Sequence, residues 1–348
     1  MHGPKDRVLG ILGHTMNPRL PKPRLLIARA VFPEVIQRLE ACFEVDSNQA
    51  DTVLDATQLA RRLRDKQALL STAGDVIDEA LLSRCPSLRI CANLAVGFGN
   101  LDLAAMSARG IVATHTPGVL TETTADFGFA LLMATARRLG EGERCVREGQ
   151  WTKWSVDFMA GQDIHGSTLG VLGMGRIGQG VARRGARGFG MRVIYHSRTR
   201  LSPADEAALP ARLVGMDELL READHLVLTL AHTAATHHLI DARALAHMKP
   251  GATLVNIARG GVVDEAALVD ALRSGRIAAA GLDVFEHEPA VHPGLLSLPN
   301  VVLTPHMASA SRATRLRMAH LAADNLIGFF ETGRALTPVP APALSAPA

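Results

Sequence analysis

Between Arg24 and residue 116, short apolar runs alternate with stretches in which apolar residues recur at helical spacing. Val35, Leu39 and Phe43, for example, fall on one face of a helix. The short apolar runs are typical of strands that are buried on both faces. Strands are expected at 24–30, 68–72, 88–95 and 111–116, and helices at 33–43, 57–65, 78–84 and 101–108. This alternation predicts a parallel sheet with right-handed crossovers.

A helix that is apolar almost all round is predicted to begin at Thr121, where the sequence reads TETTADFGFALLMATARRL. Its first threonines are suited to capping it. Such a helix is normally buried between layers or domains, so we place a domain boundary near residue 120. Six further strands, the number expected of a doubly wound sheet, are predicted at 169–172, 191–196, 225–230, 252–257, 279–285 and 301–306.

The last predicted helix, 311–331, follows the last strand, and we expect it to return and complete the first domain. The predicted fold class is α/β, with two doubly wound parallel-sheet domains. One is discontinuous, formed by 24–120 and 309–335, and the other, 121–308, is inserted into it. Residues 1–23 and 336–348 are rich in proline and are expected to be loose extensions.

Gly173, Gly175 and Gly178 follow an apolar strand in the spacing GxGxxG, and helix-forming residues come next. The first glycine permits the turn, the second lets a phosphate approach the backbone, and the third lets the helix pack on the strand. Free backbone N–H groups at the start of the helix can then bind a pyrophosphate. We therefore predict a dinucleotide site here, which includes Arg176 and Ile177.

Charged residues follow three of the predicted strands, where ligands bind in open α/β sheets. Arg259 follows one strand, the segment from Asp283 to Glu288 ends the next, and His306 ends the last. A guanidinium can hold a carboxylate through two parallel hydrogen bonds, and an imidazolium can give a proton to a carbonyl oxygen. A carboxylate nearby favours the charged imidazole. Together these groups suit the reduction of a 2-oxo acid by a nicotinamide cofactor.

Four segments in order, LGMGRIG, NIARGGVVDE, GLDVFEHEP and LTPHMASA, resemble motifs of the D-isomer-specific 2-hydroxyacid dehydrogenases. The similarity runs from about Arg24 to Gly333. TPGVLTETTADFGFALLMATARR and WTKWSVDFMAGQDIHG resemble the glyoxylate/hydroxypyruvate (2-ketogluconate) reductase branch. The resemblance implies a Rossmann nucleotide domain inserted into a flavodoxin-like substrate domain. It also implies reduction of small 2-oxo acids to D-2-hydroxy acids, and a homodimer formed through residues 121–160.

The resemblance also implies roles for single residues. Arg259 would bind the substrate carboxylate, Glu288 would assist the histidine, and His306 would donate the proton. Further implied site residues are Val96 and Gly97, whose amides meet the substrate carboxylate, and Thr124 and Asp283, which contact the cofactor.

Neighbouring residues leave some alternatives. Glu286 competes with Glu288 for the carboxylate role, although the proline that follows Glu288 favours the latter. His237 and His238 are expected to be structural, and Trp154 is either a wall of the substrate pocket or a core tryptophan. No metal ion is expected.

The end of the second strand of the nucleotide domain bears on the choice of cofactor. NAD-specific sites carry Asp or Glu there. In this chain His196 is followed by Ser197, Arg198 and Thr199, which can bind a 2′-phosphate instead. The sequence therefore predicts NADP in preference to NAD. The alternative is that Arg198 stacks on the adenine or points into solvent.

Composition excludes several classes of protein. The 37 basic and 34 acidic residues are interspersed, which disfavours nucleic acid as a partner, and no apolar run is long enough to span a membrane. The four cysteines are irregularly spaced, which predicts free thiols in the cytoplasm. Two alternative functions remain: a phosphonate (phosphite) dehydrogenase, and a non-catalytic dinucleotide-sensing protein like the corepressors of this fold.

Overall fold

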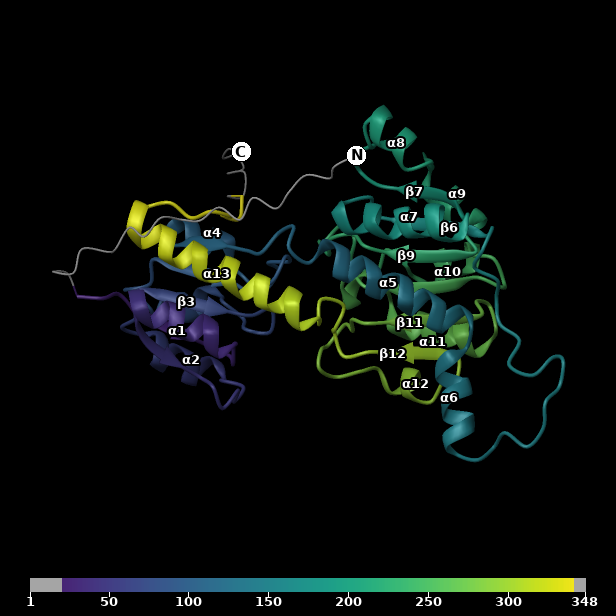
Figure 1. The fold of residues 1–348 in the computed structure, drawn as a ribbon, viewed down its shortest axis with the longest axis horizontal. Coiled ribbons are helices and arrows are strands. Elements are labelled where there is room, and N and C mark those ends of the chain that lie inside the picture. Colours follow the sequence, from purple (N-terminus) through teal and green to yellow (C-terminus); the bar gives the residue numbers. More distant parts are fainter. Residues whose placement is uncertain (1–20, 341–348) are drawn as a thin grey trace, which may run out of the picture. The chain divides into compact units, whose positions relative to one another are not determined.

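The structure is a computed structural model that describes residues 21–340. The chain folds into two compact units (Figure 1). The first unit contains the described residues up to Pro117 and from Arg315 on, and the second unit is Gly118–Thr314. The expected loose segment 1–23 lies almost wholly outside the described residues.

The first unit has a five-stranded parallel sheet in the order β2-β1-β3-β4-β5, which is the flavodoxin-like order. One face is covered by α2, α3 and α4, and the other by α1 and α13. The strands are β1 (Arg24–Ile27), β2 (Glu44–Ser47), β3 (Ala68–Ser71), β4 (Ile90–Asn93) and β5 (Val112–Thr114). The helices are α1 (Pro33–Cys42), α2 (Ala56–Leu63), α3 (Glu79–Leu82), α4 (Leu103–Ala108) and α13 (Arg312–Thr332).

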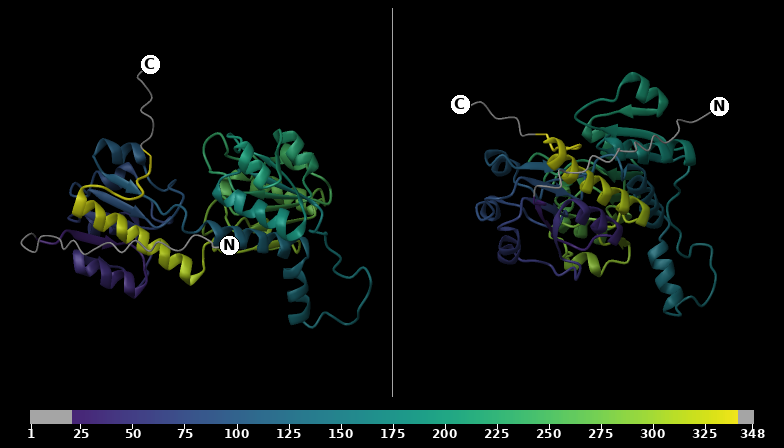
Figure 2. Two further views of the ribbon diagram at one scale, coloured as in Figure 1. Left: turned by 45° about the horizontal axis from the view of Figure 1, so that its top comes forward. Right: turned by 60° about the vertical axis from the view of Figure 1, so that its left-hand side comes forward.

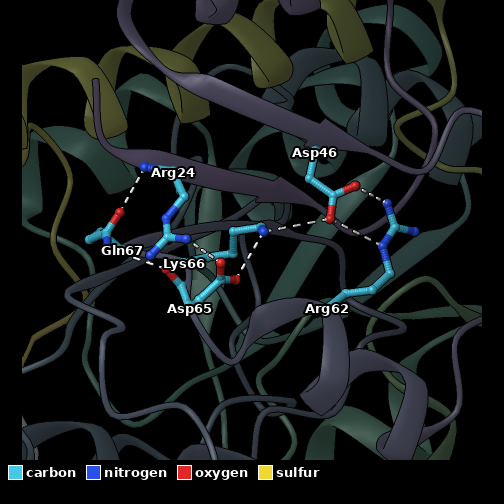
Figure 3. A network of polar contacts seen from close by, with 6 residues as sticks. All are labelled: Arg24, Asp46, Arg62, Asp65, Lys66 and Gln67. Carbon is cyan, nitrogen blue, oxygen red and sulfur yellow. Dashed lines mark hydrogen bonds and ion pairs between the residues drawn. The ribbon is translucent and has the colours of Figure 1, made fainter. Parts of the chain in front are cut away.

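The edge strand β2 is absent from the sequence prediction. Its residues, EVDS, include a single apolar side chain because the strand pairs only with β1 and is not buried. Charged groups hold this edge instead (Figure 3). Asp46 of β2 pairs with Arg62 and Lys66, and Lys66 also contacts Asp65 at 3.0 Å. These partly exposed pairs each contribute little stability.

The second unit has a seven-stranded parallel sheet in the order β12-β11-β10-β9-β6-β7-β8, which is the Rossmann order with one additional strand. One face is covered by α5 and α7, and the other by α9 to α12. The strands are β6 (Thr168–Leu172), β7 (Arg192–His196), β8 (Ala211–Leu213), β9 (His225–Leu228), β10 (Thr253–Asn256), β11 (Ala279–Leu282) and β12 (Val301–Leu303). The helices are α5 (Thr121–Ala136), α6 (Leu139–Arg147), α7 (Arg176–Phe189), α8 (Pro203–Ala208), α9 (Met216–Glu222), α10 (Ala242–His247), α11 (Glu265–Arg273) and α12 (Pro293–Leu296).

Two details of the second unit differ from expectation. The sheet has seven strands rather than six, because the three-residue edge strand β8 carries too short a pattern to be recognised. Helix α5 begins after Leu120 without a side-chain cap, so its threonines do not serve as caps. One of them, Thr123, instead bonds Thr314 through their hydroxyls at 2.6 Å, which ties residues up to Thr314 to this unit.

The C-terminal segment is packed where a loose extension was expected from residue 336. The Thr337 hydroxyl donates to the His115 carbonyl at 2.6 Å, and the Val339 N–H donates to the Ala113 carbonyl at 2.8 Å. Val339 is buried in the core of the first unit. The expectation is therefore wrong for residues 337–339, because proline does not prevent an extended segment from lying along β5.

Helix α6 and the segment after it, residues 139–163, project from the second unit and are called the arm below (Figures 1 and 2). The arm returns where Gln162 N–H donates to the Ala136 carbonyl at 2.8 Å. His225, which is fully buried, donates to the Asp163 carbonyl at 3.0 Å, and burial lowers its pKa. Trp154 is 76% exposed, so within one chain it is not a core tryptophan.

Candidate active site

The glycine loop joins β6 to α7 at the point where the strand order of the second sheet reverses. Gly173 has a φ of +98°, and a Cβ there would lie 2.7 Å from the Leu230 nitrogen. A Cβ on Gly178 would lie 2.2 Å from the Gly173 carbonyl oxygen. A Cβ on Gly175, in contrast, would meet nothing within 4 Å. The backbone at Gly175 is thus open to a phosphate at the start of a helix, as dinucleotide binding requires.

Two arginines beside this loop are available for phosphate. Arg176, the first residue of α7, and Arg198, after β7, are exposed, and their guanidinium groups make no hydrogen bond or ion pair within residues 21–340. Arg200 differs, because its guanidinium is held by Glu206 at 2.9 Å. Ser197 is partly exposed beside Arg198. The other predicted cofactor residues are Thr199, which is exposed, Ile177 in the first turn of α7, and Thr124, which is buried in the first turn of α5.

Arg259 follows β10 in a short loop that Asn256 holds. The Asn256 side chain donates to the Arg259 carbonyl at 2.9 Å and accepts from the Ala258 N–H at 3.0 Å. Gly260 packs so closely on the next strand end that a Cβ there would lie 1.8 Å from the Phe285 carbonyl carbon. This contact brings Arg259 towards the segment that carries Glu288.

The Arg259 guanidinium is desolvated and largely unpaired. Among residues 21–340 it makes one hydrogen bond, to the Ala258 carbonyl at 2.6 Å. Burial lowers its pKa, and the charge of Glu288 acts in the opposite direction. Because an arginine stays charged in proteins, this side chain is a partly buried cation with donors to spare.

Glu288 and His306 form a hydrogen-bonded pair. His306 Nδ1 lies 2.7 Å from Glu288 Oε2, and Glu288 Oε1 accepts from the Phe285 N–H at 2.9 Å. Burial alone would raise the pKa of Glu288, but the hydrogen bonds from His306 and Phe285 and the charges of His306 and Arg259 outweigh it. The pKa of Glu288 therefore lies below its usual range. His306 Nε2 makes no hydrogen bond within the described part of the chain.

The turn that carries His306 is organised by Asp283, which is fully buried. The Asp283 carboxylate accepts from the Thr304 hydroxyl and from the Met307 and Ala308 N–H groups, each at 2.8 Å. The Asp283 carbonyl accepts from the His306 N–H at 2.8 Å. His306 itself has a φ of +49°, a conformation that L-residues rarely adopt. Sequence reasoning gave Asp283 only a cofactor contact and missed this support of the turn.

In the first unit, the loop with Val96 and Gly97 has its carbonyls fixed and its amides free. The Val96 carbonyl accepts from His115 Nδ1 at 2.9 Å, and the Gly97 carbonyl accepts from the Asn93 side chain at 3.1 Å. The N–H groups of Val96 and Gly97 have no partner among residues 21–340. Asn93 and His115 were not predicted as supports of this loop. The one sequence signal that could have suggested this support of the loop is Asn93, a polar residue at the end of the apolar strand β4, where it is buried.

The second unit matches a known family. Residues 129–308 match the model of the D-isomer specific 2-hydroxyacid dehydrogenase, NAD binding domain. A glyoxylate reductase of Thermococcus onnurineus is 47% identical over 312 residues, which are 88% of this chain and 93% of the relative. The chain belongs to the D-isomer specific 2-hydroxyacid dehydrogenases. The predicted family and fold are confirmed, and the protein is an NAD(P)-dependent 2-hydroxyacid dehydrogenase, which reduces 2-oxo acids.

Other members of the family agree with this assignment. A glyoxylate reductase of Aeropyrum pernix is 48% identical over 316 residues, which are 89% of this chain and 93% of the relative. Among solved structures, the NADPH-dependent glyoxylate/hydroxypyruvate reductase of Sinorhizobium meliloti, in complex with NADP and malonate, has a TM-score of 0.82 and 39% identity. That alignment covers 91% of this chain and 97% of the other. Within residues 21–340 of this dehydrogenase, all helices are too short or too polar to cross a membrane.

Proposed function

We propose that this dehydrogenase reduces glyoxylate and hydroxypyruvate with NADPH, and that 2-ketogluconate is a further candidate substrate. The observation that carries the proposal is the unpaired, desolvated Arg259 guanidinium beside the His306–Glu288 pair. The printed activities of the relatives support the same substrate class. The chiral products are expected to be D-2-hydroxy acids, as the family name indicates.

The proposed mechanism uses each group once. Arg259 binds the substrate carboxylate. Val96 and Gly97 of the first unit, whose amides are free among the described residues, are kept as proposed substrate-binding residues. His306 donates its Nε2 proton to the carbonyl oxygen, while Glu288 holds Nδ1–H and stabilises the imidazolium. When bound, the reduced nicotinamide supplies the hydride that adds to the carbonyl carbon. The product is a 2-hydroxy acid, and His306 is left neutral until it takes a proton from solvent.

The residues around the glycine loop fit a dinucleotide. Gly175 leaves the backbone open, and Arg176 stands at the start of α7, where a pyrophosphate is favoured. Arg198 and Ser197 follow β7 without a carboxylate beside them, which supports NADPH. We also keep Thr124, Ile177, Thr199 and Asp283 as proposed cofactor residues.

The cofactor proposal is tested by comparing Arg198→Ala with the matched variant Arg200→Ala, whose guanidinium is already engaged by Glu206. Loss of a charge-assisted hydrogen bond to the 2′-phosphate should raise KM for NADPH about 10- to 100-fold and leave KM for NADH unchanged. Arg200→Ala should change neither the KM for NADPH nor the KM for NADH. An equal effect of Arg198→Ala on the two cofactors, or a wild-type preference for NADH, contradicts the proposal.

The substrate proposal is tested with a panel of 2-oxo acids, followed by NADPH absorbance. We expect turnover of glyoxylate and hydroxypyruvate and none of phosphite in the oxidative direction. Arg259→Lys should lower kcat/KM about 10- to 100-fold, because lysine cannot form the bidentate pair. Cofactor binding without turnover of any 2-oxo acid would favour the dinucleotide sensor, which the relatives do not support.

We further propose that the protein is a homodimer formed through the arm. The arm exposes large apolar side chains that no part of the described chain covers: Leu139, Val146, Trp151, Trp154 and Val156. Such a concentration of exposed apolar surface is typical of a protein interface. We also propose a cytoplasmic location, which the four unpaired cysteines support.

A further inference from the structure

A second histidine–carboxylate group lies beside the catalytic segment. His238 Nε2 is 2.7 Å from Glu286 Oε1, two residues before Glu288 in the chain. The His237 ring stacks on that of His238 at 3.9 Å, and His232 Nε2 lies 3.3 Å from His237 Nδ1. One potential ligand atom of each of His237, His238 and Glu286 lies within 4.8 Å of the others.

The backbone around this group is fixed from both sides. His238 has a φ of +49°, and its N–H donates to the Gly261 carbonyl at 2.9 Å. The Glu286 N–H donates to Glu265 Oε1 at 2.8 Å. Gly261 lets two of the histidine rings approach its backbone closely, because a Cβ there would lie 2.9 Å from His232 Nε2 and 3.5 Å from His237 Nδ1. A side chain at position 261 would therefore displace the His232 ring.

The distances between the side chains resemble those around a small metal ion. Two ligands at about 2.0–2.1 Å from a tetrahedral Zn²⁺ lie about 3.3–3.4 Å from each other. His232 Nε2 and His237 Nδ1 already have this separation, and the His238–Glu286 contact would have to open by about half an ångström. His237 is exposed, so its ring can turn from the stack towards a common centre and an ion can enter from solvent.

We propose that His237, His238 and Glu286, with His232 as a fourth ligand, bind a divalent transition-metal ion such as Zn²⁺. Imidazole and carboxylate ligands suit Zn²⁺, Ni²⁺ and Cu²⁺, whereas Mg²⁺ prefers oxygen alone. Glu286 shares its backbone segment with Glu288, so an ion that draws Glu286 towards His237 also shifts the partner of His306. Occupation of the site therefore lowers turnover. This inhibition rests on the proposed function, whereas the proposal that the site binds a metal ion does not.

Binding is tested by calorimetric titration of the full-length protein with Zn²⁺, with Mg²⁺ as the negative probe. We expect one Zn²⁺ per chain, and an affinity reduced at least 10- to 100-fold in His237→Ala and in Glu286→Gln, since these remove a ligand. The matched control is His165→Ala, an exposed histidine shortly after the arm, which should bind as the wild type does. Unaltered binding in both ligand variants overturns the site.

The catalytic pair is the rival zinc site, so His306→Ala is titrated as well. Retained stoichiometry in that variant supports the site at His237, and loss of binding in that variant alone overturns it. Visible absorption of bound Co²⁺ reports tetrahedral coordination without any assay of turnover. Zn²⁺ should also inhibit the wild type and His165→Ala, but inhibit His237→Ala only at 10- to 100-fold higher concentration. Circular dichroism verifies that each variant is folded.

Discussion

His306 is held by hydrogen bonds in an unusual backbone conformation before any substrate arrives. Its backbone N–H donates to the Asp283 carbonyl, its Nδ1 is bonded to Glu288, and its φ of +49° lies in the left-handed region. A left-handed conformation costs an L-residue about 1–2 kcal/mol. The hydrogen bonds from residues 304–308 to Asp283 offset that cost, so the fold itself orients the proposed proton donor.

Glu288→Gln should lower kcat about 10- to 100-fold, because a neutral amide cannot stabilise the imidazolium through a charged hydrogen bond. Initial rates at saturating substrate measure this effect. Glu286→Gln, which removes the neighbouring carboxylate that bonds His238 instead of His306, should lower kcat much less.

The dependence of the protein's stability on acid pH follows in part from Glu288. Its pKa is depressed in the folded protein, despite burial, by the bonds from His306 and Phe285. The stabilising pair is therefore complete above the pKa of an unfolded glutamate, and it is lost only as the pH falls through the lower, folded value. As the pH falls through this interval the wild type should lose stability, whereas Glu288→Gln, which has no carboxyl group to titrate here, should lose correspondingly less; urea denaturation at a series of acid pH values measures the difference.

At the scale of elements, three adjacent strand ends carry the proposed catalytic residues. Because β10, β11 and β12 are parallel neighbours, the residues that follow them meet at one edge of the sheet. This much was predictable, since a buried strand leaves an apolar run and its carboxyl end follows in sequence. The edge strands β2 and β8 were not predictable, because a strand that is paired on one side and partly exposed leaves no such run.

The supports of the site were also beyond sequence reasoning. Asn256 and Asp283 lie in recognisable motifs, yet their function in the structure is to accept or donate hydrogen bonds within turns. Those bonds depend on how a turn folds, which residue spacing does not reveal. His115 is similar, because it reaches the Val96 carbonyl across 19 residues.

Asp283→Asn tests the turn that follows β12. In the variant, the side-chain NH₂ faces donors that bond a carboxylate oxygen in the wild type. Those buried donors are then left without an acceptor. We expect a loss of about 1–3 kcal/mol in the free energy of unfolding and a lower kcat. Urea denaturation and initial rates measure the two. Asp270→Asn, an exposed position on α11, is the control and should change neither.

The whole molecule consists of two units, each with apolar clusters on both faces of its own sheet. The arm is the exception, because its large apolar residues pack on neither core. The exposure of the arm could not be predicted from the sequence, because Trp154 was equally compatible with a position in a core.

The proposed dimer is tested at this scale with the double variant Trp154→Ser, Val156→Ser. Both side chains are more than 75% exposed within one chain, so their replacement should leave the fold of that chain intact. We expect the wild type to sediment as a dimer and the variant as a monomer, because the apolar surface of the arm is what drives association. A wild-type monomer, or a variant that stays dimeric, contradicts the interface.

The return of α13 to the first unit has a consequence for how the protein is made. Strands β1 and β3 pack against Ala319, Ala323 and Leu326, which a ribosome adds long after these strands. At ordinary elongation speeds, roughly 15 to 60 s separate the two ends of that core. The inserted unit, whose chain is continuous, can fold during this interval, while one face of the nascent first sheet is covered by α1 alone. Chaperones that shield apolar surface during translation should therefore be found on the first hundred residues.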